Sequence, residues 1–189
     1  MIDCLVVSYS SLLYFKILNW LATIWSSCFF IITPLYFIIG FLFSFSFGGF
    51  TGLILANSLI DIILHDSYFI VGHFHYVLSL GAVYSIFAAI YTYWVFFSII
   101  TPSDYLGRIQ FGWFFISTNL ISLSMHTLGI IGFPRRIYDY GLLFFRFQWI
   151  NSLGLIGIYL GLMVLCIELL GFSCSYIIII TFSLIVLGG

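Results

Sequence analysis

Two histidines, His73 and His75, lie inside a long apolar stretch, residues 67–100, that carries no Asp, Glu, Lys or Arg. Ionisable side chains are rare within membrane helices, where they usually mark functional sites. Helical residues two positions apart point about 200° from each other, so the two rings would leave opposite sides of the helix and could not share one metal ion. A neutral imidazole is a good axial ligand for haem iron. Each ring could therefore hold its own porphyrin, or each could be an ordinary core histidine with a buried partner.

A second polar pair, His65 and Asp66, comes eight residues before His73 at the start of the same stretch. The separation along a helix axis would be about 12 Å, which places the pair near a membrane surface. Asp66 could cap the helix through its side-chain oxygen. Alternatively, a carboxylate and an imidazole could bind a hard divalent cation, with waters and a carboxylate from another chain as further ligands.

A basic segment, Pro134-Arg135-Arg136, lies in a predicted loop, residues 132–146. It could be a solvated or lipid-facing basic loop. It could also bind an anion, because guanidinium groups match carboxylates with two parallel hydrogen bonds. Since successive loops alternate sides, this loop and residues 57–66 should share one membrane face. The positive-inside rule would place the arginines on the side of synthesis.

Lys16, the only lysine, lies about ten residues from either end of its predicted span, in the middle of the bilayer. A lysine near a helix end can extend its side chain to the interface. One at mid-depth must face protein or a water-filled path, and proton relay is the natural hypothesis for it.

The composition explains why these groups need a membrane to position them. Of 189 residues, 63% are hydrophobic and 6% are charged, and a soluble domain of this length could not bury so much apolar surface. We therefore predict an all-α, polytopic transmembrane bundle that forms a single domain over residues 1–189. The net charge of −1 gives no reason to expect nucleic acid as a partner, and the four cysteines show no metal or disulfide spacing.

Five helices are expected, and a possible sixth is left open. Their predicted ranges are 5–25, 35–56, 67–100, 105–131 and 149–170. The last segment, residues 171–189, is near the lower limit for a membrane span. It could be a sixth helix, a prolongation of the fifth, or a surface segment. The first residues lack the basic region and cleavage site of a signal peptide.

Three blocks of this sequence resemble subunit I of cytochrome c oxidase, in the haem–copper oxidase superfamily. The segment 50–83 is similar to the signature of the tenth helix of that subunit, and the segment 126–136 is similar to the block ending in its arginine pair. Lys16 with Asn19, Trp20 and Thr23 resembles the eighth helix. The resemblance covers about residues 10–140 and implies the last five helices of a subunit with about twelve.

This resemblance implies roles for the haem-facing residues. His73 is similar to the axial ligand of haem a3, the oxygen-reducing haem, and His75 to an axial ligand of haem a. Arg135 and Arg136 resemble the pair that binds the haem propionates. The family places the propionates on the outer face, opposite to the positive-inside expectation for these arginines.

The same resemblance implies a magnesium site and a proton path. His65 and Asp66 are similar to magnesium ligands at the interface with subunit II, and Lys16 to the lysine of a proton pathway. Leu13 replaces a family threonine one turn before Lys16, which puts the water path there in doubt.

The implied function is part of the catalytic subunit of a terminal respiratory oxidase, which transfers electrons from cytochrome c to oxygen and pumps protons. The implied partners are subunit II with its copper pair, subunit III, cytochrome c and the lipid bilayer. The implied location is the mitochondrial inner membrane, and the abundance of Phe, Tyr and Ile fits the AT-rich coding of many organelle genomes.

One departure from the family changes the expected assembly. The active-site copper needs three histidines and haem a needs a second one, but only His126 is left unassigned here. We therefore expect a split subunit I, with a separate N-terminal fragment that supplies the copper ligands, and no activity from this chain alone. The alternatives are a quinol-oxidising haem–copper oxidase and a cofactor-free transporter or assembly protein that uses the histidines as a proton relay.

Overall fold

The computed structural model describes residues 2–26, 32–97, 103–138 and 141–187. The first, second and fourth predicted helices are confirmed as α1 (Ile2–Ser26), α2 (Thr33–Ala56) and α6 (Asp104–Ile130). Pro34 lies in the first turn of α2, where its missing N–H leaves no hydrogen bond unmade. Within the described ranges the only pairing of strand type is an isolated bridge between Ser67 and Pro134, so the fold is all-helical.

The third predicted helix is a continuous rod of three parts, α4 (Tyr68–Phe74), η1 (His75–Leu80) and α5 (Gly81–Phe97). Residues 98–100 of the predicted span lie outside the described residues. The middle part is a π-helix that begins at His75. π-Helical turns are rare in proteins overall, but many of those that occur lie at functional sites. Tyr76 and Leu80 in the π-helix and Tyr84 in α5 are each at most 4% exposed, so all three face the interior of the bundle.

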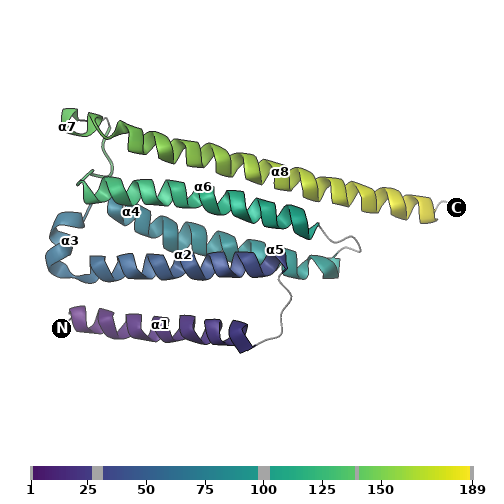
Figure 1. Cartoon of the computed structure of the whole chain (residues 1–189), viewed down its shortest axis with the longest axis horizontal. Helices are drawn as coiled ribbons and strands as arrows, with labels where there is room; N and C mark the ends of the chain where they lie inside the picture. The colour runs from purple at the N-terminus through teal and green to yellow at the C-terminus, as the bar shows by residue number, and fades with distance from the viewer. Residues whose placement is uncertain (1, 27–31, 98–102, 139–140, 188–189) are drawn as a thin grey trace.

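The fifth predicted helix is longer than expected. It forms α8 (Gln148–Leu187), one helix of 40 residues, so the tail is a prolongation of the fifth helix as far as Leu187. A helix of this length measures about 60 Å, twice the thickness of a hydrocarbon core. Val164 shares a buried cluster with Phe114, and Gly154 approaches Ser124, so α8 and α6 run antiparallel in a fixed register. This register places Asp104 level with about residue 174 of α8, and α8 extends past it (Figure 1).

The helices lie nearly parallel, with α2, the α4–α5 rod and α6 at the centre of the bundle (Figure 1). The helix α1 lies on the outer side of α2, and α8 on the outer side of α6 (Figure 1). A buried hydrophobic cluster, four of whose seven members are aromatic, joins α2, the rod, α6 and α8. Its members are Phe37, Tyr76, Leu80, Tyr84, Ala88, Phe114 and Val164.

Short helices interrupt both predicted polar connections. The segment 57–66 contains α3 (Ser58–Leu64), with Asn57 accepting a hydrogen bond from the Leu59 N–H at its start, and the segment 132–146 contains α7 (Leu142–Phe145). Both short helices lie at the same end of the bundle (Figure 1). The prediction that these two connections share one face is therefore confirmed.

The opposite end of the bundle is tied by one carboxylate. Asp104 Oδ1 accepts hydrogen bonds from the Thr33 N–H at 2.7 Å and the Thr33 hydroxyl at 2.6 Å, which joins the starts of α6 and α2. Arg108 forms an ion pair with the same carboxylate one turn later. The bonds from Thr33, more than the nearby guanidinium, hold the pKa of Asp104 below its usual value.

Two of the described helical segments, Thr33–Ala56 and Tyr68–Trp94, are long and apolar enough to cross a bilayer. The small residues Gly154, Gly157 and Gly161 let α8 approach α6 closely, as is typical of packed membrane helices. The structure is thus the transmembrane helix bundle that the composition predicts.

Candidate functional site

All four histidines share one local geometry: each Nδ1 lies against a main-chain carbonyl. The pairs are His65 with Ile62 O at 2.7 Å, His75 with Val71 O at 2.8 Å, His126 with Ser122 O at 2.9 Å and His73 with Gly48 O at 3.0 Å. A carbonyl oxygen can only accept, so each Nδ1 carries the proton and each Nε2 keeps its lone pair. This is the tautomer that a metal-binding histidine adopts when its other nitrogen is held by a carbonyl.

The ring of His73 is held by α2. Its Nδ1 lies 3.0 Å from Gly48 O and 3.0 Å from Thr51 Oγ1. Because the Thr51 hydroxyl donates its own proton to Gly48 O, the threonine oxygen is free to accept from His73. A Cβ added to Gly52 would lie 3.0 Å from His73 Cε1, so a larger residue there would crowd the ring.

The ring of His75 bonds within its own rod, one turn back to Val71 O, at the first residue of the π-helix. In the described part of the chain, no other helix supplies a hydrogen bond to it. The side chain is half-buried. That the rings of His73 and His75 leave opposite sides of the rod stays a prediction.

His126 is the functional candidate that the sequence left unassigned. It is 6% exposed and lies among the rings of Phe47, Phe69 and Tyr76. Its Nε2 is buried without a hydrogen-bond partner. A Cβ on Gly72 would lie 2.5 Å from His126 Nδ1, so this glycine makes room for the ring. The only sequence signal for the site was a histidine within an apolar helix.

The predicted metal site, His65 and Asp66, and the predicted anion site, Arg135 and Arg136, meet in an ion pair between Asp66 and Arg135, which we call the clamp. Arg135 donates from Nε to Asp66 Oδ1 at 2.9 Å, and its Nη2 lies 2.8 Å from the same oxygen. The main chains are also joined, since the Arg135 N–H donates to Asp66 O at 2.9 Å and the Tyr68 N–H donates to Phe133 O at 2.9 Å. Asp66 (φ 59°) and Arg136 (φ 63°) both adopt the left-handed backbone conformation, which non-glycine residues adopt at a cost.

This clamp leaves part of the predicted metal site available. Arg135 contacts only Oδ1 of the Asp66 carboxylate and makes no bond to Oδ2. The ring of His65 is exposed. In the described ranges, no three His, Cys, Asp or Glu residues gather closely enough to hold a metal ion. The pair His65–Asp66 would therefore need waters or another chain to complete a cation site.

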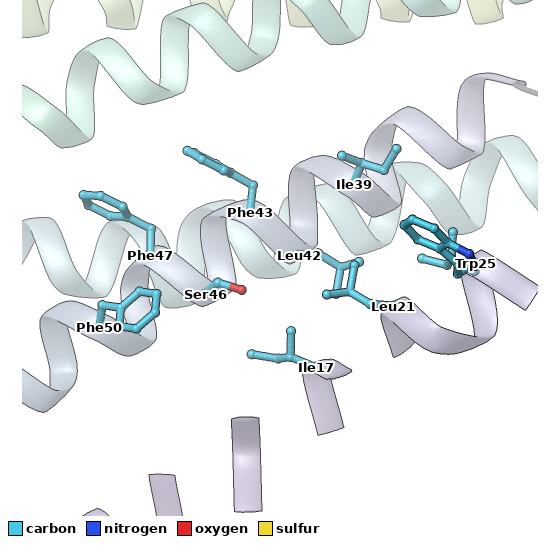
Figure 2. Close-up of a pocket in the computed structure, with 10 residues that line it drawn as sticks. Ile17, Leu21, Trp25, Ile39, Leu42, Phe43, Ser46, Phe47 and Phe50 are labelled. Atoms are coloured by element: carbon cyan, nitrogen blue, oxygen red, sulfur yellow. The ribbon is translucent and has the colours of Figure 1, made fainter. Parts of the chain in front are cut away.

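Lys16 is not brought near the histidines. It is exposed on α1, and α2 lies between α1 and the rod that carries His73 and His75 (Figure 1). Beside it, α1 and α2 enclose an open groove of about 830 Å³. Its lining is apolar apart from the Ser46 hydroxyl and the Trp25 indole nitrogen, as Figure 2 shows.

Comparisons with known proteins decide the family. The sequence profile of the family described as cytochrome c and quinol oxidase polypeptide I matches residues 4–183. The chain belongs to this family. Cytochrome c oxidase subunit 1 of Eremothecium gossypii is 45% identical over 140 residues, which are 74% of this chain and 26% of that protein. The chain thus spans about a quarter of the length of this polypeptide I relative.

A solved haem–copper terminal oxidase dimer shares the fold, with a TM-score of 0.58 at 20% identity over 77% of this chain and 26% of that one. Membership in the polypeptide I family implies an oxidoreductase subunit with haem and copper as cofactors. The donor set fits part of this requirement, because His73, His75 and His126 each keep a free Nε2 inside a membrane helix.

Proposed function

We propose that this chain forms the haem-bearing part of the catalytic subunit of a terminal oxidase that passes electrons from cytochrome c to oxygen. The observation that carries the proposal is the pair His73 and His75, two residues apart on one rod, each with Nδ1 held by a carbonyl and Nε2 free. Nε2 is the atom that an axial haem ligand uses. The rod would hold two haems at a fixed separation, which suits rapid electron transfer between them.

In this proposal His73 binds haem a3 and His75 binds haem a. When bound, the haems supply irons that accept and release electrons and, at one of them, bind oxygen. The chain orients the ligands: Gly48 O and Thr51 fix the ring of His73, and Val71 O fixes that of His75. Each carbonyl also makes its imidazole a stronger donor, because it accepts the other ring proton.

We propose that Arg135 and Arg136 bind the haem propionates, and that His65 and Asp66 bind magnesium. Two nitrogens of the Arg135 guanidinium, Nε and Nη2, contact Asp66, and both reach the same oxygen, Oδ1. Arg136 is exposed and lies in the same turn. An arginine that holds a metal-site carboxylate and a propionate together would link the two sites physically.

Lys16 is proposed as part of a proton path from the inner side, because a lysine at mid-depth must face protein or water. Lys16→Met removes the only charged side chain of the predicted span 5–25 and should slow reduction of the oxygen site. An unchanged rate would remove Lys16 from the path.

The rest of the oxidase is also a proposal. The copper ligands and a second haem a ligand would come from outside these 189 residues, and subunits II and III, cytochrome c and the lipid of the mitochondrial inner membrane would surround the chain. A separate N-terminal polypeptide as the source of these ligands stays a prediction, which intact-mass analysis of the purified complex tests. Proton pumping likewise belongs to the whole complex.

Haem absorbance of the purified complex tests the proposal. His73→Ala and His75→Ala should each lower the absorbance of one haem, while Phe74→Ala, between them and half-exposed on the same rod, should lower neither. No loss in either histidine variant would favour the cofactor-free transporter or assembly protein instead. A copper pair in the partner subunit would favour cytochrome c over quinol as the electron donor.

A further inference from the structure

The short stretch that joins α7 to α8, residues 142–149, has two different sides. Main-chain hydrogen bonds keep it in helical turns: the Phe147 N–H donates to Phe144 O at 2.9 Å, and the Ile150 N–H donates to Phe147 O at 3.0 Å. On one side, Phe144, Phe147 and Ile150 pack in a hydrophobic cluster with Leu128 of α6. This packing fixes the rotation of the stretch, so its opposite side points away from the bundle.

The side that points away carries Leu142, Phe145, Arg146 and Trp149, which we call the α7 face. Their spacing of three, four and seven residues is that of neighbours on one side of a helix. Leu142 is 98% exposed, Phe145 66% and Trp149 61%, and Arg146 is exposed as well. The ion pairs within the described ranges involve other arginines, so the α7 face offers three large apolar groups and one positive charge that no described carboxylate neutralises.

The α7 face lies at the level of the membrane surface. Because Gly154 approaches Ser124 and the two helices are antiparallel, Gln148 at the start of α8 is level with Ile130, the last residue of α6. Both helices run from this level into the bilayer. Figure 1 shows α7 at the edge of the bundle, at the same end as α3. Trp rings are enriched at this depth, and an arginine there extends its guanidinium to the lipid headgroups.

The same side of α8 stays apolar deeper in the bilayer. Ile156 and Met163 follow Trp149 by one and two heptads and are 51% and 64% exposed. They lie away from the glycines of α8 that approach α6. A positive charge and an aromatic ring at the surface, with an apolar strip that runs inward from them, match the charge and shape of a single phospholipid with an anionic headgroup.

We propose that the α7 face binds an anionic phospholipid of the surrounding bilayer. The guanidinium of Arg146 donates two hydrogen bonds to oxygens of the lipid phosphate, which its planar fork matches. The three apolar side chains of the face contact the glycerol and upper acyl region, and one acyl chain follows Ile156 and Met163. Arg146 favours a headgroup with net negative charge, because the cationic group of a zwitterionic lipid offsets the phosphate. This site goes beyond the proposed function and does not depend on haem.

Photolabelling of the purified complex tests the lipid site. The complex is placed in phosphatidylcholine vesicles that contain a trace of phosphatidylglycerol with a diazirine midway along one acyl chain, or a trace of phosphatidylcholine with the same modified chain. The anionic probe should label residues 142–163 several-fold more strongly than the zwitterionic probe. Equal labelling by the two probes, or no labelling by either, would overturn the proposal.

Three variants assign the preference to one side chain. Arg146→Gln should bring the ratio of the two labels close to one, whereas Arg146→Lys keeps the charge and should keep most of the preference. Gln148→Ala is the matched control, since Gln148 is exposed at the same depth but uncharged, and it should leave the ratio unchanged. A full preference for the anionic probe in Arg146→Gln would also overturn the proposal.

Two further measurements separate the lipid site from other uses of this face. Haem absorbance should equal that of the wild type in all three variants, because neither Arg146 nor Gln148 holds a haem in the proposed function. A loss of absorbance in Arg146→Gln would assign Arg146 to a haem and overturn the lipid site. A photoreactive benzophenone side chain at Leu142 should attach to lipid, and attachment to a peptide of any other polypeptide would overturn it too.

Discussion

The protonation of His73 is set by groups on another helix. Gly48 O and Thr51 Oγ1, both in α2, accept from its Nδ1, so the lone pair stays on Nε2. His75 achieves the same tautomer with a carbonyl of its own rod. The two rings thus depend on different parts of the structure, and only the first can be disturbed from α2.

Thr51→Val tests this dependence. The valine keeps the shape of the side chain but removes the hydroxyl, so His73 retains one acceptor, and partners of this kind usually change metal affinity about 10–100-fold. We expect a loss of haem at His73 and none at His75, read from the absorbance of the purified complex.

The control for this variant is Thr51→Ser, which keeps the hydroxyl and should restore the absorbance. A valine variant with full haem content at His73 would mean that Gly48 O alone fixes the ring.

At the scale of elements, α4 and α6 approach to backbone contact. A Cβ on Gly129 would lie 2.1 Å from Phe69 N and 2.4 Å from Phe69 Cα. Main-chain atoms cannot move aside as a flexible side chain can, so the pair of helices depends on this glycine. The same contact holds the clamp between Asp66 and Arg135, which lies just beyond both helix ends.

Gly129→Ala should therefore separate α4 from α6. We expect a loss of about 1–3 kcal/mol or more in stability, the usual cost of overpacking, measured as a lower unfolding midpoint of the detergent-solubilised complex. Gly112→Ala is the control on the same helix, since nothing lies within 4 Å of its added Cβ. Equal midpoints for the two variants would show that the helices can shift apart freely.

The stabilisation that the hydrogen bonds from Thr33 in α2 to Asp104 in α6 provide should depend on pH. The bonds from Thr33 lower the pKa of Asp104 in the folded chain, so this stabilisation is complete above the unfolded value, about 4. Its contribution is lost as the pH falls through the lower, folded pKa. Asp104→Asn should remove this dependence, so the difference in unfolding midpoint between wild type and variant should shrink below about pH 4. A constant difference down to pH 2 would contradict it.

At the scale of the whole molecule, the number of histidines limits what this chain can bind by itself. These 189 residues contain four histidines, of which His126 alone has no role in the proposal. If copper is bound by three histidines, as the resemblance to subunit I implies, residues from elsewhere must supply the others.

The isolated chain in detergent should consequently fail to reduce oxygen, even when haem is supplied. Oxygen consumption with reduced cytochrome c as donor measures this, and the complete complex is the positive control. Activity of the isolated chain would refute the requirement for outside residues.

The sequence alone determined the helices and the placement of its rare polar groups on them. Apolar runs end where polar residues and Pro34 begin, so α1, α2 and α6 could be placed closely. The rotation of an ideal helix predicts that the rings of His73 and His75 leave opposite sides. The assigned cofactor roles came from resemblance, and these remain predictions for each residue.

Only the tertiary structure paired residues that are far apart in the chain. Asp66 with Arg135, Thr51 with His73, Asp104 with Thr33 and Gly72 with His126 are all contacts between helices or helix ends. Such pairs depend on the register in which helices pack, and a hydrophobic pattern gives only the side of a helix that is buried. The continuity of α8 was undecided for a related reason, because an apolar tail is equally compatible with a longer helix, a new span or a surface segment.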